Sequence, residues 1–286
     1  MFSDTHFHLP LVKKINPDFN VNDFFYSLKG HNTFFAMDIG TRAIDLKERH
    51  DFITNAFSNL PQELSSWCKK HYFFSAGIWP DVEAIKNRQS EISLLEKSIT
   101  QGPSLAAIGE CGIDHHWNPL GADGRKESDF TKEVYEGERE LFLMQLSLAK
   151  KLKKPIVVHS RDAFADTYEC IKESSYDRGI IHCFSYGLDE AKAFLDLGYY
   201  ISFSGSVTYT KKSKIDSIKE LLNFIPKDRI LLETDSPYLA PVPFRGKINN
   251  PLLVEHTYNF VAELTAMSVE ELSDCVDSNC KKLFLL

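Results

Sequence analysis

The chain has 286 residues, of which 43% are hydrophobic and 26% charged, and its formal net charge is −7. This composition is typical of a globular protein and excludes disordered, collagen-like and coiled-coil chains. No apolar run approaches the ~20 residues that span a bilayer, and the first residues lack the basic and apolar regions of a secretory signal. Because acidic residues are in excess, we expect any contact with nucleic acid to be local.

Six cysteines are spread along the chain without a Cys-x-x-Cys pair. A chain of this length needs no disulfides for stability, so we interpret them as reduced thiols. With no signal sequence, this usage predicts a cytoplasmic protein that does not associate with membranes. No linker or low-complexity segment interrupts the sequence, so we expect one domain over residues 1–286, and a monomer.

Short β-branched or aromatic runs alternate with amphipathic runs from one end of the chain to the other. The predicted strands are residues 2–9, 33–40, 72–79, 105–114, 155–160, 179–185, 199–205 and 229–236. Alternating strands and helices indicate βα units and a parallel sheet. Eight such units in this length predict an α/β fold, a (β/α)8 TIM barrel. The alternative is an open doubly wound sheet, although no G-x-G-x-x-G opens the first helix.

The amphipathic segments give the helices between and after these strands. The predicted helices are residues 138–152, 189–197, 215–224 and 251–266. The tail, residues 268–286, begins with Ser268 as an N-cap and Glu271 completing a capping box, which predicts a last helix. The longest irregular stretch, residues 115–132, follows the fourth strand and would lie over the mouth of a barrel.

The first predicted strand carries a His-x-His pair. Because side chains alternate along a strand, Asp4, His6 and His8 share one face. Two imidazoles at this spacing can reach the same ion, and neutral imidazole is a common metal ligand. Taken alone, the pair also fits two histidines that are exposed or hydrogen-bonded.

Four more strands end in residues of the types that bind metals or phosphates. They are Glu110 and Asp114 in the fourth strand, His159 and Arg161 in the fifth, His182 in the sixth, and Glu233 and Asp235 in the eighth. Each interrupts a run typical of buried core, where a carboxylate or imidazole is costly unless it is paired or bound to metal. Barrel enzymes build their active sites at the carboxyl ends of their strands. The sequence therefore predicts one site at this rim.

Four histidines and at least two carboxylates exceed the shell of one tetrahedral zinc ion. We therefore expect two divalent ions bridged by a carboxylate, an arrangement typical of phosphatases and nucleases. The mixed nitrogen and oxygen donors favour Zn, Mn, Fe or Co over calcium, and Mg fits if one position consists mainly of carboxylate and water.

Seven motifs carry a family resemblance over nearly the whole chain: DTHFHL, GECGID, PIVVHSRDA, GIIHCFS, GYYISFSG, LLETDSPYLAP and RGKINNP. With them, the chain resembles the TatD family of metal-dependent hydrolases, within the amidohydrolase-like barrels. The resemblance implies hydrolysis of DNA phosphodiesters, often as a 3′–5′ exonuclease. It also implies a ligand set for two ions: His6 and His8 with Asp235 for the first, His159 and His182 for the second, and Glu110 as the bridge.

Three features depart from the family pattern. Pro10 stands where the family has an acidic residue after H-x-H-L, and Trp79 replaces the histidine of a Gly-x-His-Pro motif. Residues 117–130 form a longer and more polar loop than is usual. None of these changes removes an implied ligand, so the metal prediction stands, and we expect the substrate contacts on that side to differ.

The predicted catalytic residues are Asp235 and Glu110, with Asp235 both a metal ligand and a proton acceptor. Arg161, Lys211 and Lys212 are candidate phosphate-binding residues, because guanidinium and ammonium groups bind phosphate oxygens. A salt bridge for Arg161, or solvated lysines, fits the sequence equally well.

Further residues on the same rim could assist. Lys214 and Arg245 would extend the basic patch, and Trp117 and Tyr238 could stack on bases, although packing is the simpler role for each aromatic ring. Cys111 and Cys183 alternate with the ligands, so we expect both to point toward the helices.

Three functions remain open from the sequence. The leading one is a deoxyribonuclease acting on single-stranded DNA ends. The same site could instead hydrolyse an ester or amide, such as the bond of an aminoacyl-tRNA, because barrels of this type host many chemistries. A metal-stabilised binding module without turnover is the third, and the complete ligand set argues against it.

Overall fold

The computed structural model describes residues 2–116 and 125–285, and within them eight parallel strands pair in sequence order. The strands are β1 (Asp4–Phe7), β2 (Ala36–Asp38), β3 (Tyr72–Ala76), β4 (Ala107–Asp114), β5 (Ile156–Arg161), β6 (Gly179–Ile181), β7 (Tyr200–Phe203) and β8 (Ile230–Leu232). Beyond β8 the chain returns to β1, where Ser236 bridges Phe7 and the Asp235 amide donates to the His6 carbonyl at 2.8 Å. The sheet therefore closes into the predicted (β/α)8 TIM barrel.

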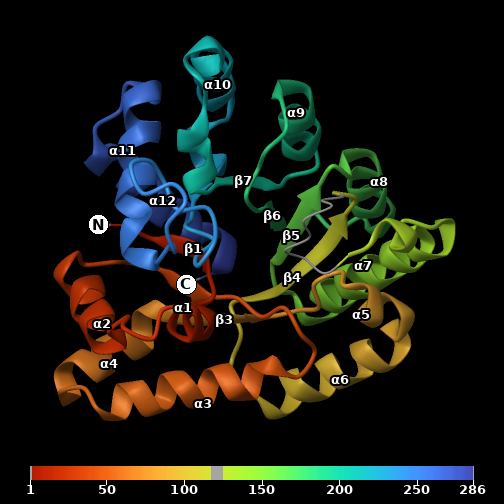
Figure 1. The fold of residues 1–286 in the computed structure, drawn as a ribbon, viewed down its shortest axis with the longest axis horizontal. Coiled ribbons are helices and arrows are strands. Elements are labelled where there is room, and N and C mark those ends of the chain that lie inside the picture. Colours follow the sequence, from red (N-terminus) through yellow and green to blue (C-terminus); the bar gives the residue numbers. More distant parts are fainter. Residues whose placement is uncertain (1, 117–124, 286) are drawn as a thin grey trace.

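Helices surround the strands on the outside of the barrel (Figure 1). They are α1 (Leu9–Ile15), α2 (Val21–Gly30), α3 (Asp45–Ser58), α4 (Gln62–His71), α5 (Val82–Lys86), α6 (Arg88–Gln101), α7 (Lys132–Leu152), α8 (Phe164–Ser174), α9 (Leu188–Asp196), α10 (Ile215–Phe224), α11 (Val254–Thr265) and α12 (Val269–Phe284). In the part of the chain described, no helix is both long and apolar enough to cross a bilayer.

The local signals for the helices are confirmed. The Ser268 side chain accepts from the Glu271 amide and Glu271 accepts from the Ser268 amide, so the predicted capping box begins α12. Helix α10 has the predicted bounds, whereas α7 begins at Lys132, capped by Thr131, instead of at residue 138. The apolar core lies between the strands and these helices.

Most of the strand predictions are too long at their carboxyl ends, although β4 ends at Asp114 as predicted and β5 runs one residue further than predicted. The runs predicted to reach residues 185 and 236 stop at Ile181 and Leu232, after which the chain turns. Cys183 and Asp235 adopt positive φ angles of 47° and 54°, which an extended strand does not contain. His182, Cys183 and Asp235 therefore lie in loops, where strand alternation no longer decides which way a side chain points. Glu110 and His159 lie within β4 and β5.

Candidate metal centre

Glu110 owes its place to two glycines in β4. Gly109 and Gly112 have φ angles of +125° and +150°, a region that other residues rarely adopt. A Cβ atom on Gly112 would lie 1.9 Å from the carbonyl oxygen of His159. Glycine at this position thus allows β4 and β5 to approach closely, and the Glu110 carboxylate reaches the middle of the site.

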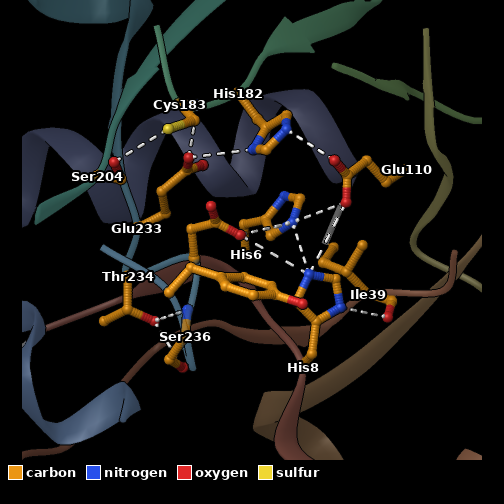
Figure 2. Close-up of polar contacts among 12 residues, drawn as sticks. His6, His8, Ile39, Glu110, His182, Cys183, Ser204, Glu233, Thr234 and Ser236 are labelled. Atoms are coloured by element: carbon orange, nitrogen blue, oxygen red, sulfur yellow. Dashed lines mark hydrogen bonds and ion pairs between the residues drawn. The ribbon is translucent and has the colours of Figure 1, made fainter. Parts of the chain in front are cut away.

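The two oxygens of Glu110 face two different pairs of histidines. Its Oε2 lies 3.3 Å from Nε2 of His6 and 3.8 Å from Nε2 of His8. Its Oε1 lies 3.0 Å from Nδ1 of His159 and 3.0 Å from Nε2 of His182. Figure 2 shows one oxygen of Glu110 facing His182 and the other facing His6 and His8. A carboxylate placed in this way can bridge two cations.

Each histidine pair has the spacing of two ligands on one ion. The nitrogens of His6 and His8 that face each other are 3.3 Å apart, and so are those of His159 and His182. Two nitrogens bound to one tetrahedral ion at about 2.0–2.1 Å would lie about 3.3–3.4 Å apart. Asp235 Oδ1 lies 3.6 and 3.7 Å from the first pair. The donor set therefore fits divalent cations, with Asp235 joining the first pair.

The buried charges of the site shift the pKa values of its carboxylates and imidazoles. Burial alone would raise the pKa of Glu110, but the surrounding imidazoles, His182 above all, hold that pKa well below its usual range. Burial works against the charge of His159, yet the carboxylates of Asp114 and Glu110 raise the pKa of this imidazole to about 9. A bound cation would replace these protons as the partner of the carboxylates.

In three of the four imidazoles, the ring nitrogen that points away from the centre of the site lies close to a carboxylate or carbonyl oxygen. Asp114 Oδ2 lies 2.9 Å from His159 Nε2, and Glu233 Oε1 lies 3.3 Å from His182 Nδ1. The Ile39 carbonyl lies 3.1 Å from His8 Nδ1. Contacts of this kind fix the ring orientation and tautomer of a metal-binding histidine. Asp114 and Glu233, predicted to point into the site, therefore position its candidate ligands.

Asp4 also belongs to the predicted inward face, but it lies beneath the site. Its carboxyl group accepts from the amides of His6 and Thr234 and from the Thr234 hydroxyl. Burial raises the pKa of Asp4 to about 8, although these hydrogen bonds oppose the shift. Asp4 therefore joins β1 to the segment after β8 and holds His6 in place.

The expectation that Cys183 points toward the helices is wrong. Its Sγ lies 3.1 Å from the Ser204 hydroxyl and its amide donates to Glu233 Oε1 at 2.6 Å (Figure 2). The cause is the turn after β6, which begins before the cysteine. The thiol lies beside the candidate ligands.

Asn249 is a residue of the site whose role the sequence did not reveal. It is fully buried, and its side-chain amide donates to the carbonyls of Thr234 and Tyr238 at 2.9 and 2.6 Å. Asn249 thereby fastens both ends of the turn that carries Asp235. Its one signal in the sequence is its place in the RGKINNP motif.

The predicted phosphate-binding residues are exposed. Arg161 ends β5, and its charge helps to lower the pKa of Asp114, after the larger effects of His159. Lys211 and Lys212 lie between β7 and α10, in and beside the 3-10 helix Lys212–Lys214. Their substrate contacts stay predictions, and Trp117 lies outside the described residues.

Trp79, which replaces a histidine of the family pattern, borders the site. Its ring packs edge-on against His159, with centroids 5.7 Å apart. The buried guanidinium of Arg125 lies 5.9 Å from the Trp79 ring and 5.8 Å from the Phe130 ring. This wall of the site is therefore covered by the end of the loop before α7.

The TatD related DNase family model matches residues 3–285 of the chain. The chain belongs to the TatD family. An uncharacterized metal-dependent hydrolase of Bacillus subtilis (strain 168), YabD, is 31% identical over 99% of both chains. Another, YcfH of Escherichia coli (strain K12), is 34% identical over 74% of this chain and 73% of its own.

A solved structure supports the same fold. The crystal structure of YJJV, a TatD homologue from Escherichia coli, has a TM-score of 0.75 and covers all of this chain and 98% of its own, at 24% identity. TatD relatives are described as metal-dependent hydrolases, and this chain has groups of residues that could hold metal ions. The resemblance seen in the sequence is thus confirmed at the level of a metal-dependent hydrolase family.

Proposed function

We propose that this TatD-family protein hydrolyses phosphodiester bonds of DNA from single-stranded 3′ ends, using two divalent ions of Zn, Mg or Mn. One observation carries the proposal: two histidine pairs, each at ligand spacing, share the two oxygens of Glu110. Paired ions of this kind are typical of enzymes that hydrolyse phosphate esters. The exposed cations on the rim favour a substrate that carries phosphate.

The mechanism assigns each group of the site a separate task. When bound, the two ions would lower the pKa of water to about 7 and withdraw charge from a phosphoryl oxygen. The side chain of Asp235 is 14% exposed, so its carboxylate reaches solvent and accepts the proton of the attacking water. Glu110 and the histidines hold their positions through Asp114, Glu233 and the buried backbone. Arg161 binds a phosphate oxygen of the substrate.

Substitution of the proton acceptor tests this mechanism. In Asp235→Asn the amide keeps the size of the side chain but cannot take the proton, so we expect kcat to fall about 10²–10⁴-fold while the fold survives. The assay follows 5′-labelled single-stranded DNA with Mg²⁺, Mn²⁺ or Zn²⁺, and circular dichroism monitors the fold. Turnover close to that of the wild type would contradict the role of Asp235.

The same assay tests the activity itself. We expect a metal-dependent ladder that shortens from the 3′ end, and none from Glu110→Ala, which serves as the control for contaminating nucleases. If the wild type binds two ions per chain and cleaves no DNA, the proposed function is wrong. Aminoacyl-tRNA is then the next substrate to try, because the same site could attack a carbonyl.

A further inference from the structure

Tyr238 is an exposed aromatic side chain fixed beside the candidate ligands. It is 51% exposed, and its ring stands edge-on to His8 with centroids 6.4 Å apart. Its amide donates to the Asp235 carbonyl at 2.9 Å and its own carbonyl accepts from Asn249. The backbone therefore holds the residue in place while half of the side chain faces solvent.

Two rim segments join next to Tyr238. The Thr208 hydroxyl accepts from the Val242 amide at 2.9 Å, and the Tyr209 hydroxyl donates to the Ala240 carbonyl at 2.7 Å. The Arg245 guanidinium lies 4.3 Å from the centroid of the Tyr209 ring. Residues 205–214, after β7, and residues 237–248, after β8, thus form one surface, which we call the β7–β8 rim.

Five cationic side chains lie on the β7–β8 rim. Across residues 2–116 and 125–285, no carboxylate lies within ion-pair distance of these side chains: Lys211, Lys212, Lys214, Arg245 and Lys247. All five are exposed. In a chain of net charge −7, this gathering is a local positive surface. Such a surface binds the phosphates of a nucleic acid.

The other aromatic ring at the centre is less accessible. Trp79 lies beside His159, but Arg125 and Phe130 cover that wall, and Arg125 is held there by an ion pair with Glu138 at 2.7 Å. Among the described residues, the side of the site next to His8 and Tyr238 therefore offers the exposed ring and the unpaired cations together.

We propose that the β7–β8 rim binds the single-stranded end of the substrate, with the base next to the scissile phosphate stacked on Tyr238 and the backbone phosphates held by Arg245 and the lysines. The inference rests on the proposed function and adds a base-binding subsite to it. Stacking on an aromatic ring accepts every base, because each base has a π-face. The subsite would select unpaired ends and not a sequence.

Removal of the base separates stacking from catalysis. The substrates are two 5′-labelled single strands. The normal strand ends in two ordinary nucleotides at its 3′ end, and the abasic strand ends in two tetrahydrofuran residues that lack a base. We expect Tyr238→Ala to raise KM about ten-fold or more for the normal strand and to leave KM for the abasic strand unchanged. Tyr238→Phe retains the ring and should match the wild type.

The matched control is Tyr26→Ala. Tyr26 is 53% exposed and belongs to α2, which is not part of the β7–β8 rim, so replacing its ring should change KM for neither strand. An equal effect of Tyr238→Ala on both strands, or no effect on either, would overturn the stacking subsite while the nuclease activity stands. No cleavage of either strand by the wild type would overturn the proposed function, and the subsite with it.

The salt dependence of KM tests the phosphate contacts. Each phosphate neutralised on a single strand contributes about 0.7 to the slope of log affinity against log salt. We expect Arg245→Gln to reduce the slope by about this amount. Lys150→Gln, at the end of α7, is the control, because Lys150 bonds the backbone of Ser174 instead. An unchanged slope for Arg245→Gln would remove this residue from the binding surface.

Discussion

The imidazole of His159 lies between two carboxylates, one on each ring nitrogen. Glu110 Oε1 is 3.0 Å from Nδ1 and Asp114 Oδ2 is 2.9 Å from Nε2. Asp114 is almost fully buried, and it does not share a candidate ion with the ring. Its charge fixes the tautomer that carries the proton on Nε2 and leaves the Nδ1 lone pair free to bind a cation. The same charge makes Nδ1 more basic, and therefore a stronger metal ligand.

We expect Asp114→Asn to weaken binding of one divalent ion about 10–100-fold, because the ring loses its charged partner. Calorimetric titration with Zn²⁺ or Mn²⁺ measures the affinity of each position. Asp162→Asn is the control, since Asp162 is exposed and pairs with His116 at 2.7 Å outside the centre. Equal affinities in the two variants would show that Asp114 does not support the ligand.

The turn after β8 is the element that brings Asp235, Tyr238 and the closure of the barrel together. Asp235 adopts a positive φ angle of 54°, and its amide pairs with the His6 carbonyl. The fully buried Asn249 donates to the carbonyls of Thr234 and Tyr238, which lie at the two ends of the turn. The geometry of Asp235 therefore depends on a residue from the following loop.

Asn249→Asp removes both donors without changing the size of the side chain. Each buried carbonyl left without a donor costs about 1–3 kcal/mol, so we expect lower stability in urea unfolding and a kcat reduced more than KM is raised. Asn250→Asp is the matched control, because Asn250 is an acceptor for the Leu252 amide and aspartate accepts equally well. If both variants behave like the wild type, Asn249 does not hold the turn.

At the scale of the whole molecule, a buried charge cluster ties β2, β3 and α3 together beneath the rim. Arg49 donates to Asp38 at 2.7 Å, to Asp45 at 3.0 Å and to the Ser75 carbonyl at 2.6 Å. The other oxygen of Asp38 accepts from the Tyr72 hydroxyl at 2.9 Å. Because all these charges are buried, each depends on its partners.

We expect Arg49→Met to lower the free energy of unfolding by about 3–5 kcal/mol, since it leaves Asp38 and Asp45 buried without a cation. Urea denaturation measures the change. Arg42→Met is the control, because Arg42 is exposed and pairs with Glu48 at 3.7 Å on the surface, and such pairs contribute about 0–1 kcal/mol. A loss of less than 1 kcal/mol for Arg49→Met would contradict a stabilising role for this cluster.

Much of the fold and of the candidate site follows from local patterns in the sequence. Alternating strand and helix runs predict the eight-stranded barrel, and the capping box at Ser268 and Glu271 predicts the start of α12. The His-x-His pair and Glu110 are placed by strand alternation at the carboxyl ends of strands. Such features depend on neighbours a few residues apart, so a single sequence contains them. The metal roles themselves stay predictions.

The tertiary structure decides what depends on contacts distant in the sequence. Strand β6 ends before Cys183, so the thiol points toward Ser204. The alternation of apolar residues in the sequence does not predict that turn. Glu110 places one oxygen at each histidine pair because Gly112 lets β4 lie against β5. Asn249 reaches the Asp235 turn from the next loop. The sequence by itself determines residue types and short spacings. Packing, burial and the direction of a loop side chain depend on contacts that form only when the barrel closes.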